Sequence, residues 1–207
     1  PLMGPNRWRA ELPEMKRAFD RYYAEIDRVG QIVLRGVAVS LGLPERFFAE
    51  RYTKPLAQGS LVHYPPQPPD LGAEQFGVGA HTDYGCITFV CQDDSGGLQA
   101  HNRAGEWIEA PPIPGTLVVN IGDLLARWTN DLFRSTPHRV VNRSGRDRYS
   151  LAVFYDPDFD ADVSAIASCL APGEAPRYPP TTCGAHVLSK FDAAFAYRNQ
   201  KAAPARA

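Results

Sequence analysis

Residues 81–91, His-Thr-Asp-Tyr-Gly-Cys-Ile-Thr-Phe-Val-Cys, place a polar His-Thr-Asp segment directly before an apolar and β-branched run. The run 86–91 has the length and composition of a buried strand. His81 and Asp83 stand two positions apart, and side chains with that spacing on an extended backbone face the same way. An imidazole nitrogen and a carboxylate oxygen therefore converge on one point. The stretch predicts a β-fold with a polar site beside a core strand.

Further short extended runs lie on both sides of this stretch, between residues 60 and 155. Turns such as Ser95-Gly96-Gly97 and Arg103-Ala104-Gly105 separate them. Short strands at this spacing predict an antiparallel sandwich or a jelly roll. The expected strands are Ser60–Tyr64, Cys86–Cys91, Gly97–Ala100, Trp107–Glu109, Thr116–Ile121, Pro137–Asn142 and Arg148–Tyr155.

Helices are expected before and after the strands. Residues 15–41 carry apolar side chains at steps of three and four, which is typical of one face of an amphipathic helix. A second short helix is expected after Pro44, because proline is tolerated in a first helical turn. A last helix is expected at residues 185–198, after a proline-rich passage. The apolar face of the long helix consists of Phe19, Tyr22, Ile26, Val29, Val33, Val37 and Leu41.

The chain has 207 residues and a formal net charge of −1. This is the size of one domain, and the charge argues against a dedicated nucleic-acid-binding protein. No run approaches the roughly 18 continuous apolar residues of a membrane span, and the first residues lack the features of a signal peptide. Four cysteines occur without a Cys-x-x-Cys pair, which favours reduced thiols. We therefore expect a cytoplasmic protein without nucleic-acid or membrane partners.

A metal site needs a third ligand, and His138 opens another expected strand. Two histidines and one carboxylate on one face of an octahedron leave three positions open, which is the facial triad of non-haem Fe(II) oxygenases. A His-x-Asp pair alone is usually structural, and zinc accepts the same three ligand types. These residues therefore leave an oxygenase, a zinc hydrolase and a non-catalytic module open, with His81, Asp83 and His138 as the candidate ligands.

Arg148 and Ser150 lie on an expected strand whose even positions share one face. A guanidinium fork binds a carboxylate through two hydrogen bonds, and a serine hydroxyl adds a third. An exposed arginine on an edge strand is the plain alternative for Arg148 alone. Combined with the candidate triad, the pair predicts a binding site for a carboxylate ligand.

These residues and the motifs around them resemble the isopenicillin N synthase-like family of Fe(II)- and 2-oxoglutarate-dependent oxygenases. The resemblance covers residues 61–157, and Gly4-Pro5-Asn6 with the long helix resembles bacterial members. Val62 stands where many plant members have asparagine. The matching motifs are His81-Thr82-Asp83, His138, Arg148-Tyr149-Ser150, Tyr64 in His63-Tyr64-Pro65-Pro66, Gly96-Gly97-Leu98-Gln99 and Asn120-Ile121-Gly122-Asp123.

The resemblance implies a mainly β fold, with a double-stranded β-helix (jelly roll) core and flanking α-helices. It implies Fe(II) as the metal and 2-oxoglutarate as the co-substrate, bound through its distal carboxylate. Phe154 matches a position that lines the substrate pocket in some relatives, with a core position as the alternative. Trp128 either lines the pocket or caps the sheet. The implied metal ligands are His81, Asp83 and His138, and the implied co-substrate residues are Arg148, Ser150 and Tyr64.

The activity implied by the resemblance is oxidation of a small molecule by O₂, with release of succinate and CO₂ from 2-oxoglutarate. Hydroxylation is the default outcome. An oxidase that uses no 2-oxoglutarate, an ethylene-forming reaction and a catalytically inactive jelly-roll binding module remain alternatives. The near-neutral charge disfavours a nucleic-acid demethylase, and the sequence does not identify the substrate.

The domain expected from this resemblance spans residues 1–207. Residues 1–58 form a helical support region, residues 59–160 the jelly-roll catalytic core, and residues 161–207 an irregular segment and a helix. Family members usually carry a strand-and-helix segment before the long helix. We expect that N-terminal part to be missing from this chain.

Overall fold

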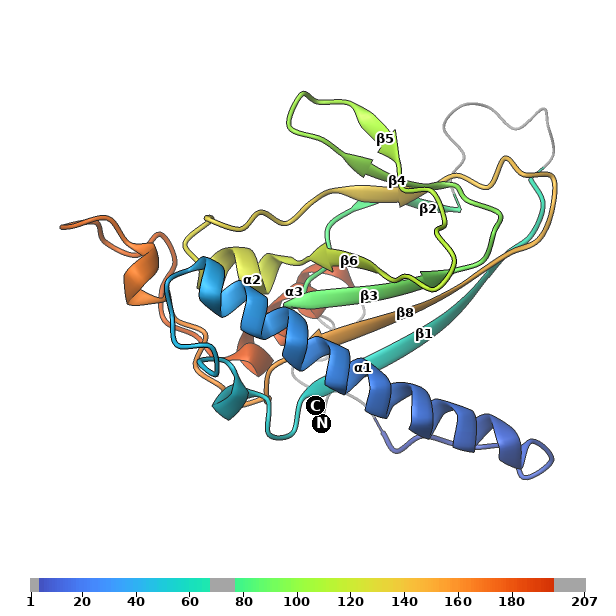
Figure 1. Ribbon diagram of the computed structural model, residues 1–207, viewed down its shortest axis with the longest axis horizontal. Coiled ribbons are helices and arrows are strands. Elements are labelled where there is room, and N and C mark those ends of the chain that lie inside the picture. Colours follow the sequence, from blue (N-terminus) through green and yellow to red (C-terminus); the bar gives the residue numbers. More distant parts are fainter. Residues whose placement is uncertain (1–3, 68–76, 196–207) are drawn as a thin grey trace, which may run out of the picture.

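The computed structural model describes residues 4–67 and 77–195 of the protein. Its strands form two four-stranded antiparallel sheets, one above the other in the view of Figure 1. This confirms the predicted jelly-roll fold with flanking helices. The strands are β1 (Leu56–Tyr64), β2 (Val78–His81), β3 (Ile87–Gln92), β4 (Leu98–His101), β5 (Trp107–Glu109), β6 (Val118–Ile121), β7 (His138–Val140) and β8 (Arg148–Asp156).

The first sheet has the order β1-β8-β3-β6, and the second has the order β2-β7-β4-β5. Strand β8 pairs with β1 along its whole length, from Leu56 opposite Asp156 to Tyr64 opposite Arg148. Each expected strand is present, but β1 begins at Leu56 rather than Ser60, and β2 was not expected. The additional residues of β1, Leu-Ala-Gln-Gly, lack the β-branched side chains that mark a strand, so pairing with β8 defines this part.

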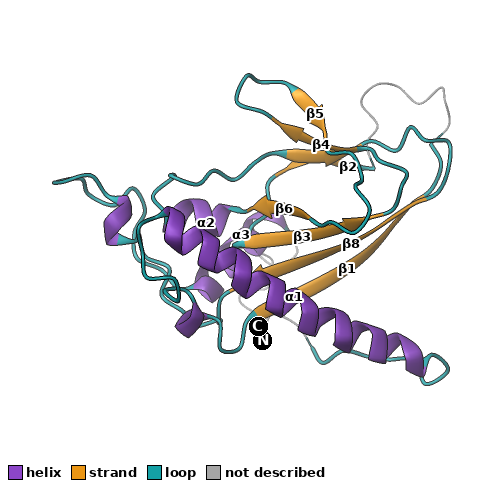
Figure 2. Cartoon of the chain, viewed as in Figure 1, coloured by secondary structure: helices purple, strands orange, loops and turns teal. Residues whose placement is uncertain are grey.

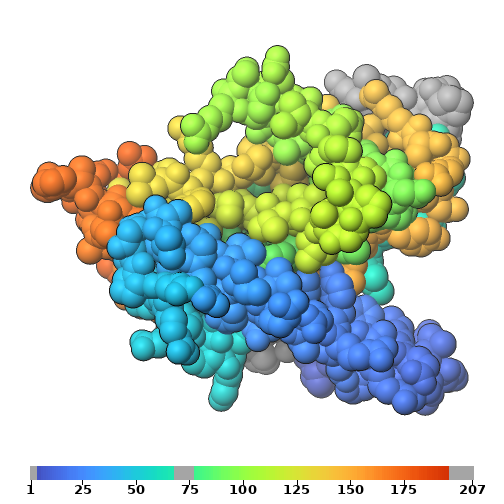
Figure 3. Space-filling model, viewed as in Figure 1, coloured from blue at the N-terminus to red at the C-terminus, as the bar shows by residue number. Residues whose placement is uncertain are grey.

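The long helix α1 (Pro13–Ser40) covers the outer face of the first sheet (Figures 1 and 2). It forms a continuous ridge across this side of the space-filling view (Figure 3). Gly30 permits the close approach, because a Cβ atom there would lie 2.5 Å from the ring of Tyr155 on β8. Of the predicted apolar face, Ile26 and Val37 are buried, while its other members are half-buried. The buried side of the helix consists of Ile26, Gly30, Leu34, Val37 and Ala38.

The short helix expected after Pro44 is present only as a 3₁₀-helix that follows a series of turns. Residues 44–51 form successive turns, in which Phe47 N–H donates to the Pro44 carbonyl at 2.8 Å, and end in the 3₁₀-helix η1 (Ala49–Arg51). Phe48 is fully buried and packs edge-on against Trp128 with 5.0 Å between ring centroids. The turns place this side chain in the core.

The remaining helices lie at the ends of the strands. The sequence did not predict α2 (Asp123–Trp128), and η2 (Ala167–Cys169) is a single 3₁₀ turn. Helix α3 (Cys183–Ala194) corresponds to the last expected helix, whose residues 196–198 lie outside the described residues. No helix in the described ranges is long and apolar enough to span a bilayer. The largest hydrophobic cluster lies between the first sheet, α1, α2 and α3.

Candidate active site

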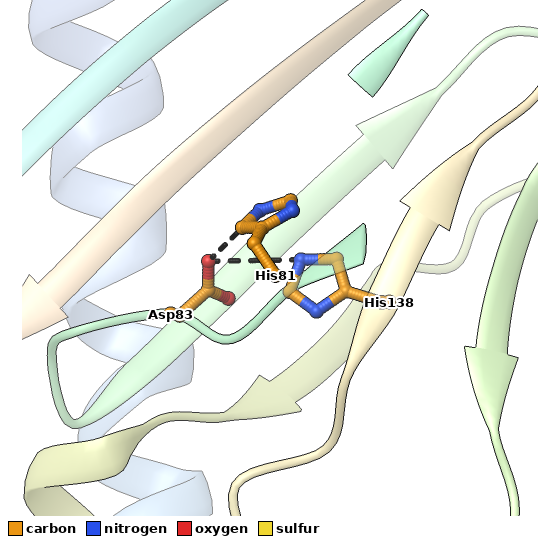
Figure 4. A group of neighbouring side chains, drawn as sticks. All are labelled: His81, Asp83 and His138. Atoms are coloured by element: carbon orange, nitrogen blue, oxygen red, sulfur yellow. Dashed lines mark ion pairs between the residues drawn. The ribbon is translucent and has the colours of Figure 1, made fainter. Parts of the chain in front are cut away.

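His81, Asp83 and His138 come together between the two sheets (Figure 4). His81 ends β2 and His138 begins β7, and the two residues are direct partners across these strands. The Oδ1 atom of Asp83 lies 3.6 Å from Nε2 of His138 and 3.9 Å from Nε2 of His81. One donor atom from each residue lies within 4.8 Å of the others. The geometry therefore suits one metal ion held by two imidazoles and a carboxylate.

Backbone carbonyls fix the orientation of both imidazoles. Nδ1 of His81 lies 2.8 Å from the Gly79 carbonyl oxygen, and Nδ1 of His138 lies 3.1 Å from that of Thr136. Each Nδ1–H donates to its carbonyl, so the lone pair is on Nε2, the atom that faces Asp83. Such outer hydrogen bonds orient metal-binding histidines and raise their basicity.

The loop that carries Asp83 is held by the turn between β6 and α2. The Asp123 N–H donates to the Asp83 carbonyl at 2.8 Å, and the Leu124 N–H donates to the Gly85 carbonyl at 3.0 Å. Gly122 is required here, because a Cβ atom would collide with the Gly85 carbonyl oxygen. This contact gives the Asn-Ile-Gly-Asp motif a structural purpose, since it positions one metal ligand.

Asn120 is a site residue that the sequence analysis treated only as part of a framework motif. Its Nδ2 lies 3.4 Å from Oδ2 of Asp83 and 3.5 Å from Nε2 of His138. The amide is therefore able to donate to the Asp83 oxygen that a metal leaves uncoordinated. The sequence signal that could have identified Asn120 as a site residue was its place in the Asn-Ile-Gly-Asp motif.

Arg148 is buried at the start of β8 and is 1% exposed. Its Nε donates to the Gly96 carbonyl at 2.6 Å and its Nη2 to Oε1 of Gln92 at 3.2 Å, while the guanidinium lies 4.7 Å from the centre of the Tyr64 ring. Nη1 is buried with no hydrogen-bond partner among the described residues. A buried cation with an unsatisfied donor is costly unless a ligand completes it.

The register of the first sheet brings the predicted co-substrate residues together. Tyr64 pairs with Arg148, and Val62 pairs with Ser150. Tyr64 and Ser150 are both buried, and Tyr64 packs in a small apolar cluster with Leu98 and Val140. Val62 stands at the position where the resemblance places an asparagine in many plant members. Its apolar side chain packs against this cluster.

Gln92 is the second site residue that sequence reasoning missed. Gln92 lies on β3, opposite Ser150 of β8. Its Nε2 donates to the Ala110 carbonyl at 3.0 Å, and its Oε1 accepts from Nη2 of Arg148. The carboxamide thereby fixes the rotation of the guanidinium. No local pattern marks it, because its role depends on the pairing of β3 with β8.

A cavity of about 950 Å³ opens beside the triad, and His81 and Asp83 are part of its wall. Phe154 lines this cavity, at the position predicted to face a substrate. Trp128 does not line it: its side chain is 2% exposed in the main hydrophobic cluster, against Phe48. The interpretation of Trp128 as a pocket residue is corrected accordingly, because helix α2 turns its ring into the core.

Asp156, at the end of β8, also lines the cavity. Its Oδ1 accepts a 2.5 Å hydrogen bond from the Cys86 N–H. Burial raises the pKa of the Asp156 carboxyl to about 7, and the nearby Asp83 charge adds to the rise against the lowering effect of the Cys86 hydrogen bond. A Cβ atom on Gly85 would collide with this carboxylate, so the glycine permits it to lie beneath the ligand loop.

Residues 46–157 match the family model of the 2OG-Fe(II) oxygenase superfamily. The chain belongs to this superfamily. Fe(II) and 2-oxoglutarate are the metal and co-substrate for which this superfamily is named. The arrangement of the triad fits such a metal, and the incomplete hydrogen bonding of Arg148 fits an anionic co-substrate.

Two curated relatives illustrate the similarity. A 2-oxoglutarate-Fe(II) type oxidoreductase of Emericella nidulans is 38% identical over 214 residues, which cover 99% of this chain and 61% of the relative. Homoarginine-6-hydroxylase of Oryza sativa subsp. japonica is 38% identical over 196 residues, which cover 92% of this chain and 60% of the relative. The chain spans about half to three fifths of the length of curated relatives such as these.

Solved structures with the same fold include a full-length Neurospora crassa protein in complex with alpha-KG and thymine. It superimposes with a TM-score of 0.87 at 34% identity, over 92% of this chain and 61% of that one. A putative 2OG-Fe(II) oxygenase family protein from Caulobacter crescentus gives a TM-score of 0.84 at 35% identity, over 93% of this chain and 64% of that one.

Proposed function

We propose that the protein is a dioxygenase that oxidises a small-molecule substrate, with hydroxylation as the default outcome. The overall reaction consumes substrate, O₂ and 2-oxoglutarate and yields hydroxylated product, succinate and CO₂. The observation that carries the proposal is the unsatisfied Nη1 of the buried Arg148, together with three ligand atoms poised around one point. One feature supports anion binding and the other supports metal binding.

In this proposal His81 and His138 bind Fe(II) through Nε2, and Asp83 binds it through Oδ1. Fe(II) held there would supply a redox centre for O₂ activation, with two of the four electrons coming from the oxidative decarboxylation of 2-oxoglutarate and two from the substrate. The protein holds the three ligands on one side, which leaves positions for co-substrate and O₂. Asn120 orients the Asp83 carboxylate.

Arg148 binds the distal carboxylate of 2-oxoglutarate through its guanidinium, and the hydroxyl groups of Ser150 and Tyr64 contribute further hydrogen bonds. Charge-assisted hydrogen bonds of this kind are strong, especially where water is excluded. In this proposal, the apolar cluster of Tyr64, Leu98 and Val140 keeps water away from this end of the site. Gln92 keeps the guanidinium in one orientation. Little side-chain conformational entropy is therefore lost when the carboxylate binds.

Substrate binds in the cavity beside the triad, where Phe154 contributes an aromatic wall. We place the protein in the isopenicillin N synthase-like branch, supported by the Arg-x-Ser arrangement of Arg148 and Ser150 on β8. Residues 59–160 act as the catalytic core of a single oxygenase domain. The proposed location is cytoplasmic, supported by four free cysteines, and the proposed partners are a small molecule and O₂.

The deciding experiment measures substrate oxidation from a metabolite panel with and without 2-oxoglutarate, while succinate is counted against product. The expected result is product formation that requires 2-oxoglutarate and matches succinate in amount. Full turnover without 2-oxoglutarate would replace the proposal with an oxidase. Ethylene in place of succinate would indicate fragmentation of the co-substrate, and stoichiometric iron binding without any turnover would indicate a binding module.

A further inference from the structure

The substrate cavity is lined by carboxylates without a lysine or arginine among the described residues. Its lining includes two carboxylates, Asp83 and Asp156, and no lysine or arginine from the described part of the chain. Asp83 is committed to the metal in the proposed function. Asp156 is therefore the acidic group that remains available to a substrate, and no lysine or arginine in the described lining offsets it.

Asp156 is also placed to reach a ligand. It stands two residues beyond Phe154 on β8, so both side chains point to the same face of the sheet, the face toward the cavity. Its Oδ1 accepts from the Cys86 N–H, and no ion pair neutralises the carboxylate within the described ranges. The raised pKa of Asp156 reflects burial without a compensating cation.

Aromatic rings form much of the remaining wall. Phe154, Phe159, Phe191 and Tyr84 all line the cavity. The faces of aromatic rings attract organic cations as well as apolar groups. A ligand with a positively charged nitrogen on an apolar body would therefore meet both a carboxylate and rings.

Lys190, a basic side chain beside this wall, is already paired. Lys190 lies 5.9 Å from the centre of the Tyr84 ring, and its Nζ donates to Oδ2 of Asp123 at 2.7 Å. This ion pair directs the lysine toward α2. It does not supply a counter-charge for an acidic substrate, and it leaves Asp156 without a cation.

We propose that the cavity selects a cationic substrate, an amine or guanidine on an apolar body, and that Asp156 is the specificity-determining residue that pairs with its nitrogen. The proposal rests on the proposed function, because it assigns this cavity to the substrate. The cavity volume of about 950 Å³ is large enough for a ligand well beyond a simple alkylamine.

The test is a binding experiment that needs no turnover. The whole chain is loaded with Mn(II) and 2-oxoglutarate and titrated with three ligands of matched shape: 3-phenylpropylamine, 3-phenylpropanol and 3-phenylpropanoate. The expected order of affinity is amine, then alcohol, then carboxylate. Equal affinities, or tighter binding of the carboxylate, would overturn the proposal without any variant being made.

Asp156→Asn then assigns the preference to one residue. Asparagine retains an oxygen that accepts from the Cys86 N–H, so the ligand loop keeps its support. The amine is expected to bind roughly tenfold more weakly to this variant, equivalent to about 1.4 kcal/mol, while the alcohol is unchanged. Asp160→Asn is the matched control, because it removes the same charge from an exposed position on the following loop. Unchanged amine affinity in Asp156→Asn would contradict the assignment.

Failure of this inference is distinguishable from failure of the proposed function. Affinity for 2-oxoglutarate is measured on the Mn(II)-loaded wild type and on Arg148→Met before any amine is added. Binding of 2-oxoglutarate that is independent of Arg148 would refute the proposed function. Normal 2-oxoglutarate binding with no amine preference would refute only the role of Asp156.

Discussion

Arg148 and Asp156 stand at opposite ends of the same strand, and each buries a charge with no ion-pair partner in the described part of the chain. At the Arg148 end, neutral groups hold the cation: a backbone carbonyl, the Gln92 amide and the Tyr64 ring. At the Asp156 end, one backbone N–H holds the anion beside an open cavity. Charges left incomplete in this way are costly for folding and suit ligands of opposite sign.

The difference between the two ends lies in their enclosure. The Arg148 end is closed by apolar side chains and fits one small anion, the co-substrate. The Asp156 end faces a cavity of about 950 Å³ with aromatic walls, which suits a larger and more variable ligand. Two of the metal ligands, His81 and Asp83, line the same cavity as Asp156, and the largest predicted effect concerns the triad.

His138→Ala removes one of the three donor atoms on which both ends depend. We expect Fe(II) affinity to fall by more than roughly a hundredfold, since even outer-shell changes cost 10–100-fold. The fold is expected to persist, because His138 begins a three-residue strand and its side chain lies in the metal site and not in the main hydrophobic cluster. Isothermal titration and circular dichroism check the two statements. Full iron content in this variant would remove His138 from the triad.

Arg148→Met breaks the closed end while preserving apolar volume. We expect affinity for 2-oxoglutarate to fall by about a hundredfold, or about 2.7 kcal/mol. Stability of the apoprotein is expected to stay level or rise, because replacing a buried charge by an apolar side chain is often stabilising. Titration calorimetry and thermal unfolding measure the two quantities. A large loss of stability with normal 2-oxoglutarate binding would show that Arg148 is structural.

Asp156→Ala and Asp156→Asn sharpen the comparison at the open end. The alanine variant leaves the Cys86 N–H unpaired in the core, which we expect to cost about 2 kcal/mol of unfolding free energy. The asparagine variant retains an acceptor and is expected to cost less. Chemical denaturation of both apoproteins gives the difference. Equal stability would mean that the 2.5 Å hydrogen bond does not support the ligand loop.

Gln92→Leu has the smallest expected effect, because it removes a positioning contact and not the guanidinium itself. Affinity for 2-oxoglutarate is expected to fall about tenfold, or about 1.4 kcal/mol, with unchanged Fe(II) affinity. Gln99→Leu is a control on strand β4 of the second sheet, where the amide contacts Arg139 and Glu109. An equal loss in both variants would indicate a general effect on the sheets.

Local sequence patterns predicted the features that are themselves local. The run 86–91 and the alternation after Arg148 gave strands close to β3 and β8, and the i, i+2 spacing placed His81 with Asp83. The hydrogen bond between Arg148 and Gln92 could not be predicted in this way. It joins residues far apart in sequence, and it depends on the register of β3 with β8.

The errors have a similar cause. Pro44 is compatible with a helix start, but residues 44–51 form turns that bury Phe48 against Trp128. The same contact holds the Trp128 ring in the core and away from the cavity. Asp156 carried no motif, and its importance follows from the cavity that α3 and the ligand loop form around it. Tertiary packing decided each of these positions.

The shared strand also has a consequence for redesign. Alternate residues of β8 face inward, so positions 148 and 150 serve one ligand and positions 154 and 156 serve another. Register in a paired strand shifts only by turning every side chain to the other face. Substrate scope is therefore open to change by side-chain exchange at 154, and at 156 by residues that still accept the hydrogen bond of the Cys86 N–H. Such exchanges leave in place the residues of β8 proposed to bind 2-oxoglutarate.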